Sequence, residues 1–195
     1  MELSHFEYYL IIINVLGFIL SSINAWLYAH TADKQIDGAL TVFSILGGSV
    51  GVLLSLLLFN RKIEKRNVMS RVLIICVFVI QILLFLMIKG FLGENITFDF
   101  LTFFKNFSFI PIYWGIINLI TFIVFGIDKL AAIKNRSRIK IVTLLGLSFI
   151  GGAVGGLLGM YIFRHKTQKD YFTVGIPLMI VMQAIVIFFL TNILM

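Results

Sequence analysis

Charged residues are scarce in this chain of 195 residues. Asp, Glu, Lys and Arg make up 13% of the sequence, and apolar residues make up 60%, with a mean hydropathy of +1.05. Soluble domains carry about 25% charged residues, and a water-soluble protein of this size cannot enclose so much apolar surface. The composition therefore excludes a soluble domain and predicts an integral membrane protein.

Cysteine and proline are rarer still, with one cysteine and two prolines. Cys76 lies inside an apolar run, so it can form no internal disulfide and does not report the redox compartment. The three histidines form no i,i+4 metal-binding pair, and no P-loop, dinucleotide fingerprint or nucleophile triad is present. We expect no catalytic residues, no metal and no cofactor.

Six long apolar runs account for most of the sequence. Each is close to the roughly 20 residues that a helix needs to cross the ~30 Å hydrocarbon core, and none shows the alternation of a membrane strand. A segment in lipid must satisfy its own backbone hydrogen bonds, which favours helices. We predict an all-α integral membrane protein with six transmembrane helices, at 9–29, 39–59, 70–88, 110–130, 141–163 and 172–194.

The second half of the chain repeats the first at a shift of 104 residues. Between residues 9 and 65, 18 of 57 positions are identical without a gap, including Asn14 with Asn118 and Gly47 with Gly151. Two unrelated hydrophobic segments would not place asparagines and glycines at matching positions, so we infer a duplicated three-helix unit. We predict a first, diverged repeat at 9–88, an interfacial linker at 89–109 and a second repeat at 110–195. Three crossings per repeat would turn the second repeat over, giving two inverted repeats.

The distribution of Lys and Arg leaves two topologies open. With six crossings, one side carries ten basic residues and the other six, which weakly favours both termini in the cytoplasm. If the runs 39–59 and 141–163 instead enter and return as re-entrant hairpins, fourteen basic residues share one side, and both termini lie outside. We favour six crossings because of the spacing of the glycines.

Small residues recur every four positions in the second run of each repeat, as at Gly151, Gly155 and Gly159. This spacing is typical of the small face, or glycine zipper, of a continuous helix that packs closely on a neighbour. The alternative is that the glycines expose backbone carbonyls to a permeating ion. The predicted helix-packing positions are Gly47, Gly48, Gly51, Gly151, Gly152, Gly155 and Gly159.

Amide side chains lie within several apolar runs. Asn14 and Asn118 occupy matched positions early in their helices, and Gln81 and Gln183 lie in the middle of the third run of each repeat. Polar groups in lipid need partners, so we expect these four side chains to form hydrogen bonds between helices.

Two charged clusters are candidate substrate-binding or lipid-binding sites. The basic cluster at 164–169 suits phosphate oxygens, with interfacial snorkelling as the alternative. Asp128 lies near a membrane boundary, where it is either half of a structural ion pair or a proton-linked or cation-linked carboxylate. The first repeat has Asn24 at the matching position, and six crossings place Asp128 and His165 on opposite sides. The candidate residues are Asp128, Lys129, Arg164, His165, Lys166 and Lys169.

Residues 113–185 carry a specific set of motifs: Asp128-Lys129 with Ala131, Gly151-Gly152 with Gly155, and Phe163-Arg164-His165-Lys166-Thr167 with Lys169 and Phe172. With them, the segment resembles the domain-of-unknown-function family 1294, which is known for small bacterial membrane proteins. The resemblance implies a multi-pass protein of the bacterial plasma membrane and no established activity. An acidic residue common in that family after the basic stretch is missing here, where Arg138-Ile139-Lys140 stands.

Three classes of function fit these features. The first is a small transporter, channel or lipid translocase for an anionic or phosphate-bearing substrate. The alternative is a non-transporting scaffold or regulator that binds anionic lipid or a partner membrane protein, and a membrane-embedded enzyme is the weakest hypothesis. The expected partners are membrane lipids, an anionic small molecule or lipid headgroup, and a second copy of the chain, but not nucleic acid.

Overall fold

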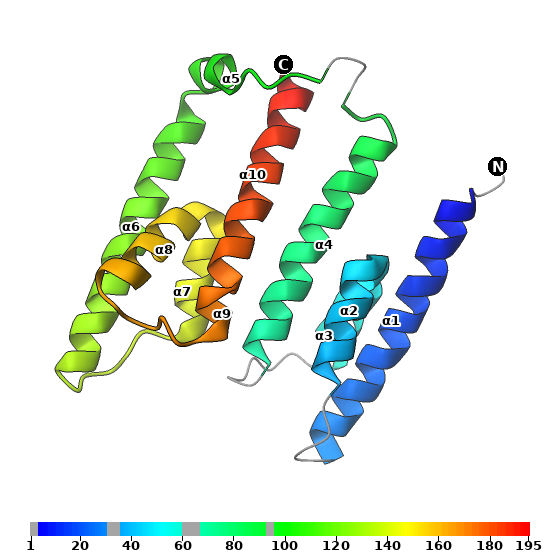
Figure 1. Ribbon diagram of the computed structural model, residues 1–195, viewed down its shortest axis with the longest axis horizontal. Coiled ribbons are helices and arrows are strands. Elements are labelled where there is room, and N and C mark those ends of the chain that lie inside the picture. The colour runs from blue at the N-terminus through cyan, green and yellow to red at the C-terminus, as the bar shows by residue number, and fades with distance from the viewer. Residues whose placement is uncertain (1–3, 31–35, 60–66, 93–95) are drawn as a thin grey trace. The chain divides into compact units, whose positions relative to one another are not determined.

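A computed structural model describes residues 4–30, 36–59, 67–92 and 96–195, and every regular element in these ranges is helical (Figure 1). The chain divides into two compact units, residues 1–84 (unit 1) and 85–195 (unit 2). The first five elements are α1 (His5–His30), α2 (Asp37–Phe43), η1 (Ser44–Gly48), α3 (Ser49–Phe59) and α4 (Val68–Ile88), whose last turn belongs to unit 2. The others are α5 (Phe100–Asn106), α6 (Phe109–Ile133), α7 (Ile141–Leu147), η2 (Ser148–Gly152), α8 (Ala153–Ile162), α9 (Asp170–Thr173) and α10 (Gly175–Leu194).

Six helical segments are long and apolar enough to cross a membrane, which confirms an all-helical, multi-pass membrane protein. Large apolar side chains are exposed along all of them, as expected for surfaces that face lipid tails. The segments agree with the six predicted runs to within a few residues. They are His5–Leu27, Asp37–Phe59, Val68–Ile88, Phe109–Ile133, Ile141–Ile162 and Asp170–Leu194.

The fifth segment is broken in the middle. Its backbone passes through the short π-helical turn η2, where Gly151 has a φ of 132°. This left-handed backbone is accessible to glycine and strained for other residues. Arms α7 and α8 meet at this turn and form a helical hairpin beside α6 (Figure 1).

Both ends of this hairpin lie at one point on α6. The Asp128 carboxylate accepts a hydrogen bond from the Ile139 backbone N–H at 2.8 Å and lies 2.8 Å from the His165 ring. A straight helix from residue 139 to residue 165 would be about 39 Å long, so a continuous span is excluded. The tip of the hairpin contacts Asn118 on α6, ten residues from Asp128, or about 15 Å along the helix. The hairpin is therefore about half as long as the hydrocarbon core is thick.

Unit 1 contains the same hairpin. Gly47 has a φ of 113° in η1, and its carbonyl accepts a hydrogen bond from Asn14 on α1. At the other end, Asn24 on the same helix accepts a hydrogen bond from the Ile36 backbone N–H at 3.0 Å. Arm α2 therefore runs antiparallel to α1, and α3 returns parallel to it.

The prediction of a continuous helix in the second run of each repeat is therefore wrong. Length and composition make six candidate spans, but two of these fold back at a glycine, as in the re-entrant alternative. The four-residue spacing of the glycines does not indicate a continuous helix here, because these glycines have two different structural roles. One glycine in each hairpin forms the bend, and the others face a neighbouring helix. The inverted arrangement depends on three crossings per repeat, and the structure does not show it.

The segment before α6 carries a short helix, α5, and several exposed aromatic residues. The Asp99 carboxylate caps α5 by accepting a hydrogen bond from the Thr102 backbone N–H at 3.1 Å. Phe103 is buried, whereas Phe98 and Leu101 are more than 70% exposed. Such a mixture suits a membrane interface, so the interfacial role of residues 89–109 remains a prediction for the described part; residues 93–95 lie outside it.

Candidate functional site

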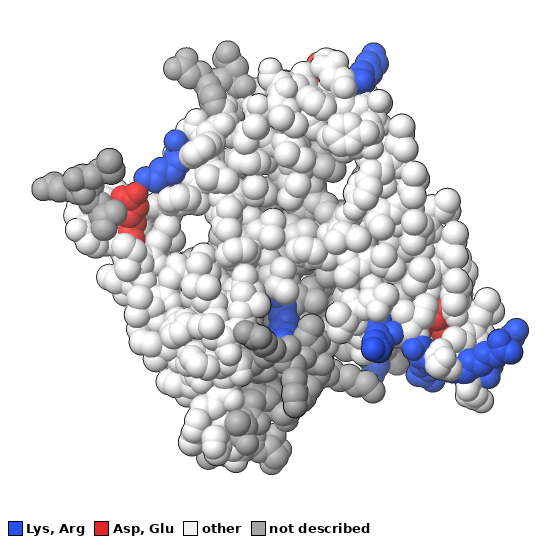
Figure 2. Space-filling model, turned by 180° about the vertical axis from the view of Figure 1, so that it is seen from behind, with Lys and Arg blue, Asp and Glu red and all other residues white. Residues whose placement is uncertain are grey.

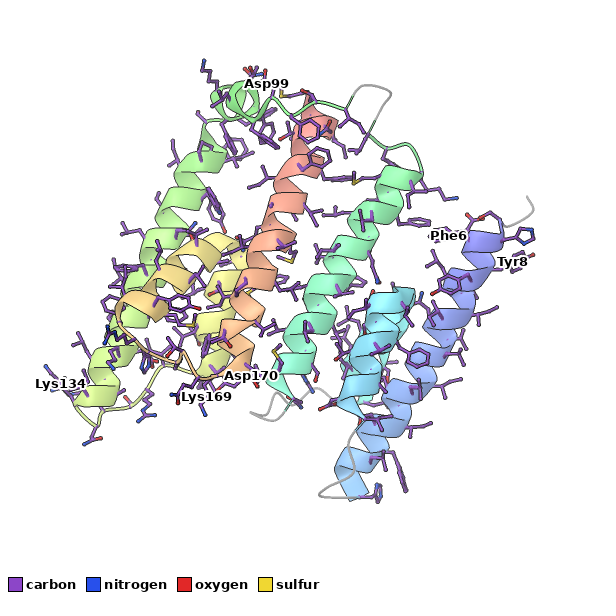
Figure 3. The ribbon with its side chains drawn as sticks, in the orientation of Figure 1. Phe6, Tyr8, Asp99, Lys134, Lys169 and Asp170 are labelled. Atoms are coloured by element: carbon purple, nitrogen blue, oxygen red, sulfur yellow. The ribbon has the colours of Figure 1, made fainter. Side chains whose placement is uncertain are left out.

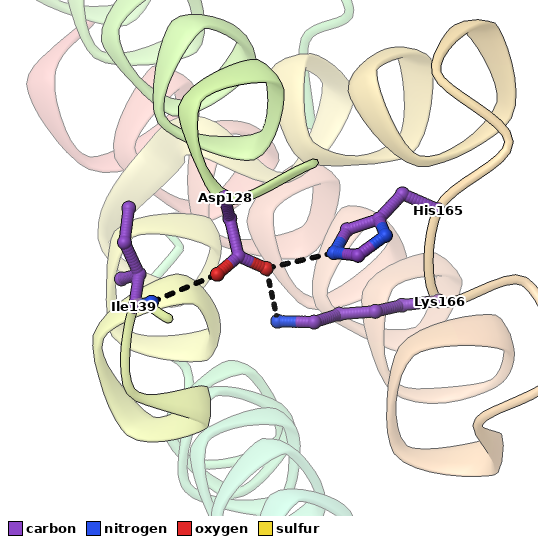
Figure 4. Close-up of polar contacts among 4 residues, drawn as sticks. All are labelled: Asp128, Ile139, His165 and Lys166. Atoms are coloured by element: carbon purple, nitrogen blue, oxygen red, sulfur yellow. Dashed lines mark hydrogen bonds and ion pairs between the residues drawn. The ribbon is translucent and has the colours of Figure 1, made fainter. Parts of the chain in front are cut away.

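Asp128 is the centre of a buried polar cluster at the open end of the unit 2 hairpin. Its side chain is fully buried, and one carboxylate oxygen lies 2.8 Å from His165 Nε2 and 2.6 Å from Lys166 Nζ (Figure 4). The other oxygen accepts the hydrogen bond from Ile139 N–H. We call Asp128, Ile139, His165 and Lys166 the latch, because they join α6 to the chain on both sides of the hairpin.

An unusual backbone positions His165 and Lys166 in the latch. Helix α8 ends with a hydrogen bond from His165 N–H to Met160 C=O at 3.0 Å, and Arg164 adopts a φ of 46°, as at many helix ends where glycine is common. Lys166 also has a positive φ, of 64°. A left-handed backbone costs about 1 kcal/mol for each non-glycine residue that adopts it. The contacts of His165 and Lys166 with Asp128 therefore offset the backbone strain at Arg164 and Lys166.

Burial and charge act in opposite directions on Lys166. Burial lowers the pKa of the Lys166 ammonium, Asp128 opposes that shift, and the positive charge of Arg138 adds to it. The ammonium also lies 5.0 Å from the centre of the buried Phe172 ring, which favours its charged form through a cation–π interaction. The cluster is thus a compensated ion pair, in which removal of either partner leaves the other in a poor environment.

The other predicted charged residues do not join the latch. Lys129 is half-buried, and Arg164 and Lys169 are exposed. Figure 3 places Lys134 and Lys169 at the same end of unit 2, and in Figure 2 Lys and Arg side chains gather near the lower edge, below a broad face with little charge. We call the exposed and half-exposed cations at this end the basic rim: Lys129, Lys134, Arg136, Arg138, Lys140, Arg164 and Lys169.

The tip of each hairpin is held by side chains that satisfy the carbonyls freed by the helix break. In unit 2, Gln183 Nε2 donates to the carbonyls of Ser148 and Phe149, at 2.7 and 3.2 Å. The Tyr113 hydroxyl donates to Ile150 at 2.7 Å, and Asn118 Nδ2 donates to Gly151 at 3.0 Å. In unit 1, Gln81, Tyr9 and Asn14 make the corresponding bonds to Ser44, Ile45, Leu46 and Gly47.

The same asparagines also cap the returning helices. Asn118 Oδ1 accepts a hydrogen bond from Gly155 N–H at 2.7 Å, and Asn14 Oδ1 accepts one from Gly51 N–H at 2.8 Å. A helix end leaves such donors without partners, and lipid supplies none. The predicted hydrogen bonds of the asparagines and glutamines between helices are therefore confirmed. The tyrosines were missed, although Tyr9 and Tyr113 also match in register.

The glycines after each bend allow a close approach to the long helix. A methyl group on Gly155 would overlap the Asn118 carbonyl oxygen, and one on Gly51 would overlap that of Asn14. Four other predicted packing positions are also tight: Gly48 against the backbone of Ile13, Gly152 against Thr121, Gly159 against Phe125, and Gly47 against Leu10. Gly151, at the bend, lies over Ile117 and Tyr113.

The side chains of the latch are a carboxylate, an imidazole and an ammonium group. Among the described residues, no group of three or more His, Cys, Asp and Glu side chains could hold a metal ion. The latch contains no hydroxyl or thiol side chain, and its carboxylate is bound by His165, Lys166 and a backbone donor. Asp128 and His165, which the six-crossing prediction placed on opposite sides, are in direct contact. Lys62, the counterpart of Lys166 in the first repeat, lies outside the described residues.

Comparison with known proteins covers the same part of the chain. Residues 118–172 match the family described as "Protein of unknown function (DUF1294)", and this range contains the whole latch and the hairpin. "Uncharacterized protein YsdA" of Bacillus subtilis (strain 168) is 44% identical over 78 residues, which are 40% of this chain and 88% of that protein. No solved structure matches the chain. The chain belongs to the DUF1294 family.

Proposed function

We propose that the chain is a non-transporting membrane protein that binds phosphate-bearing headgroups of anionic lipids at the basic rim of unit 2. The supporting observation is the division of the cations at 164–169. His165 and Lys166 are bound by Asp128 within the protein, whereas the neighbouring Arg164 and Lys169 are exposed. Among the described residues, these two make no ion pair, so their donors remain available to phosphate oxygens.

The proposal includes an orientation in the membrane. If both hairpins open toward one side, fourteen of the sixteen Lys and Arg residues lie on that side, leaving Lys89 and Lys105 on the other. The positive-inside rule assigns the basic side to the cytoplasm, and both termini then face outside. Each unit crosses twice on this proposal, so the second repeat keeps the orientation of the first and does not invert it.

The state of the hairpin tips favours binding over transport. An ion pathway along the glycines requires carbonyl oxygens that are open to the ion. The carbonyls of residues 44–47 and 148–151 all accept hydrogen bonds from side chains. The latch carboxylate is likewise bound by His165 and Lys166. These groups therefore act as structural elements of the hairpin in our proposal.

A transporter, channel or lipid translocase is the second candidate, and the depth of the hairpin is what favours it. A helical break about halfway across the hydrocarbon core is a feature of transporter binding sites. Under this alternative, the basic rim receives the anionic substrate and the hairpin moves to pass it on. The latch would then have to open during each cycle, since it closes the ends of the hairpin.

Lipid binding is tested by native mass spectrometry of the detergent-purified chain with phosphatidylglycerol or phosphatidylcholine. We expect preferential retention of phosphatidylglycerol, weakened several-fold by Arg164→Ala combined with Lys169→Ala. Lys105→Ala is the matched control, because Lys105 is an exposed cation on α5, outside the basic rim. Equal retention of the two lipids, or equal loss in the control, would count against the proposal.

Transport is tested on the same variants in proteoliposomes. The binding proposal expects no lipid scrambling and no phosphate flux above that of protein-free vesicles. Scrambling or flux that is lost in Asp128→Asn, while the folded protein is retained, would replace the binding proposal with the translocase. The two assays separate the candidates because a translocase must pass both and a binding protein only the first.

A further inference from the structure

The tip of the unit 2 hairpin contains two buried polar atoms that the protein does not satisfy. Among the described residues of unit 2, Gln183 Oε1 and Trp114 Nε1 have no hydrogen-bond partner. Gln183 is only 8% exposed, and its amide nitrogen is fixed by the carbonyls of Ser148 and Phe149. Its carbonyl oxygen therefore cannot turn away to find another partner without giving up those bonds.

Unit 1 shows what completes the same arrangement. Gln81, the counterpart of Gln183, donates to Ser44 and Ile45 in the same way, and its Oε1 accepts a hydrogen bond from the Ser49 hydroxyl at 2.5 Å. The position that matches Ser49 at the 104-residue shift is Ala153. Ser49 and Ala153 are both fully buried. A single missing hydroxyl thus separates a satisfied glutamine from an unsatisfied one.

The second atom without a partner, Trp114 Nε1, is also specific to unit 2. Trp114 matches Leu10 of unit 1, so unit 2 has added an indole N–H at the tip. A methyl group placed on Gly151 would be 3.7 Å from the Trp114 ring, which sets the ring against the bend. Unit 2 therefore combines an acceptor and a donor without partners beside residues 148–151, whereas no such atom is found at the hairpin tip among the described residues of unit 1.

Leaving such atoms dry is costly. A buried amide without a hydrogen bond loses on the order of 1–3 kcal/mol, and polar groups surrounded by lipid find no alternative partner there. Buried waters are found at otherwise unsatisfied polar groups. Ala153 differs from Ser49 by the absence of one hydroxyl, so a partner that replaces this hydroxyl must be small.

We propose that unit 2 binds a water-sized hydrogen-bond donor at Gln183 Oε1, in the place of the Ser49 hydroxyl of unit 1. The bound species is a water molecule or a small ammonium-type or hydroxyl-type solute, because both present an N–H or O–H to the amide oxygen. The site lies at the hairpin tip, about 15 Å from the latch along α6, and does not depend on lipid binding at the basic rim.

Ala153→Ser tests the site, since it supplies the missing hydroxyl with little change of volume. In X-ray hydroxyl-radical footprinting, bound water promotes oxidation of its neighbours. We expect oxidation of Met182, which is 3% exposed and adjacent to Gln183, to exceed that of Met160, which is fully buried. In Ala153→Ser this excess falls several-fold.

Further measurements identify the donor and guard against a misfolded variant. Thermal unfolding in ammonium chloride and in sodium chloride separates the two sources. If a solute binds, ammonium raises the Tm of the unaltered protein above that of Ala153→Ser. If water binds, the difference in Tm between the two proteins is the same in both salts. Equal protection of Met182 and Met160 in the unaltered protein, together with no effect of ammonium on its Tm, would overturn the proposal without any variant. A rise in Tm of Ala153→Ser with no change in footprinting would overturn it as well, since the site would then be dry.

Discussion

The two units share the hairpin and differ in what surrounds it. In both, a glycine forms the bend, an asparagine caps the returning helix, and a tyrosine and a glutamine bind the freed carbonyls. At the open end, unit 1 has the neutral Asn24, which donates to Asp37, where unit 2 has Asp128 in contact with His165 and Lys166. The shared residues therefore build the fold, and the difference at the open end is the carboxylate of Asp128, which replaces the amide of Asn24.

The largest expected effect concerns the side of the membrane that the hairpin ends face. In a Cys76→Ala background, cysteines at the exposed positions Ser137 and Gln168 should both react with a membrane-impermeant thiol reagent from the same side. A cysteine at Asn106, the exposed last residue of α5, should react from the other side. Six straight crossings instead require positions 137 and 168 to label from opposite sides.

A cysteine at Gly38 sharpens the comparison between the units. Gly38 is exposed at the start of α2, the position in unit 1 that corresponds to the beginning of α7. Two crossings per unit predict that it labels from the same side as position 168. Labelling from the side of position 106 would restore an inverted relationship between the repeats, even with both hairpins intact.

The sequence predicts the positions of the six helical segments well, but it does not predict that two of them fold back at a glycine. Hydropathy reports how apolar a segment is over about 20 residues, and a hairpin buried in the membrane is as apolar as a straight span. The period of four at Gly151, Gly155 and Gly159 is also the same in both cases. What distinguishes them is the φ of Gly151, which depends on side chains from other helices.

The charged cluster shows the same limit. The sequence identifies Asp128, His165 and Lys166 as candidates from their residue types and from the asymmetry between the repeats. Their contact cannot be predicted as long as residues 141–163 are taken for a continuous helix, which separates Asp128 from His165. The stronger signal was available in the register of the repeat. Tyr9 with Tyr113 and Asn14 with Asn118 are polar pairs that a straight helix bundle does not require, and together they satisfy the backbone of a break.

Removal of the latch carboxylate should destabilise unit 2 most. Asp128→Ala leaves Lys166 and His165 without their acceptor and frees Ile139 N–H, and breaking a buried ion pair in this way costs about 3 kcal/mol. Asp128→Asn should cost less, because it keeps an acceptor for Ile139 and reproduces the residue of unit 1. Thermal unfolding in detergent measures both, with Lys105→Ala as the neutral control. Equal stability of Asp128→Ala and the control would show that the latch is open in solution.

The close approach of the returning helices gives the next effect. A methyl group on Gly155 would overlap the Asn118 carbonyl oxygen, so Gly155→Ala must push α8 away from α6, at a cost of about 1–3 kcal/mol. Gly51→Ala should cost a similar amount in unit 1, because the contact with Asn14 is the same. Gly146→Ala, where nothing lies within 4 Å, should be neutral or stabilising. A large difference between Gly155→Ala and Gly51→Ala in thermal unfolding would contradict equivalent packing in the two units.

The smallest effect comes from the tyrosine hydroxyls. Tyr113→Phe removes the hydrogen bond to Ile150 C=O, and Tyr9→Phe removes the one to Leu46 C=O. Each leaves a carbonyl of the break without that donor, at a cost of about 1 kcal/mol, and amide exchange at the tip should accelerate in the altered unit alone. Tyr161→Phe is the control, since Tyr161 is exposed at the end of α8. Both tyrosine rings are half-exposed, so the two substitutions are comparable. If only one of them lowers the free energy of unfolding, only that hairpin depends on its tyrosine. The two units would then share the shape of the hairpin but not the contribution of this hydrogen bond to stability.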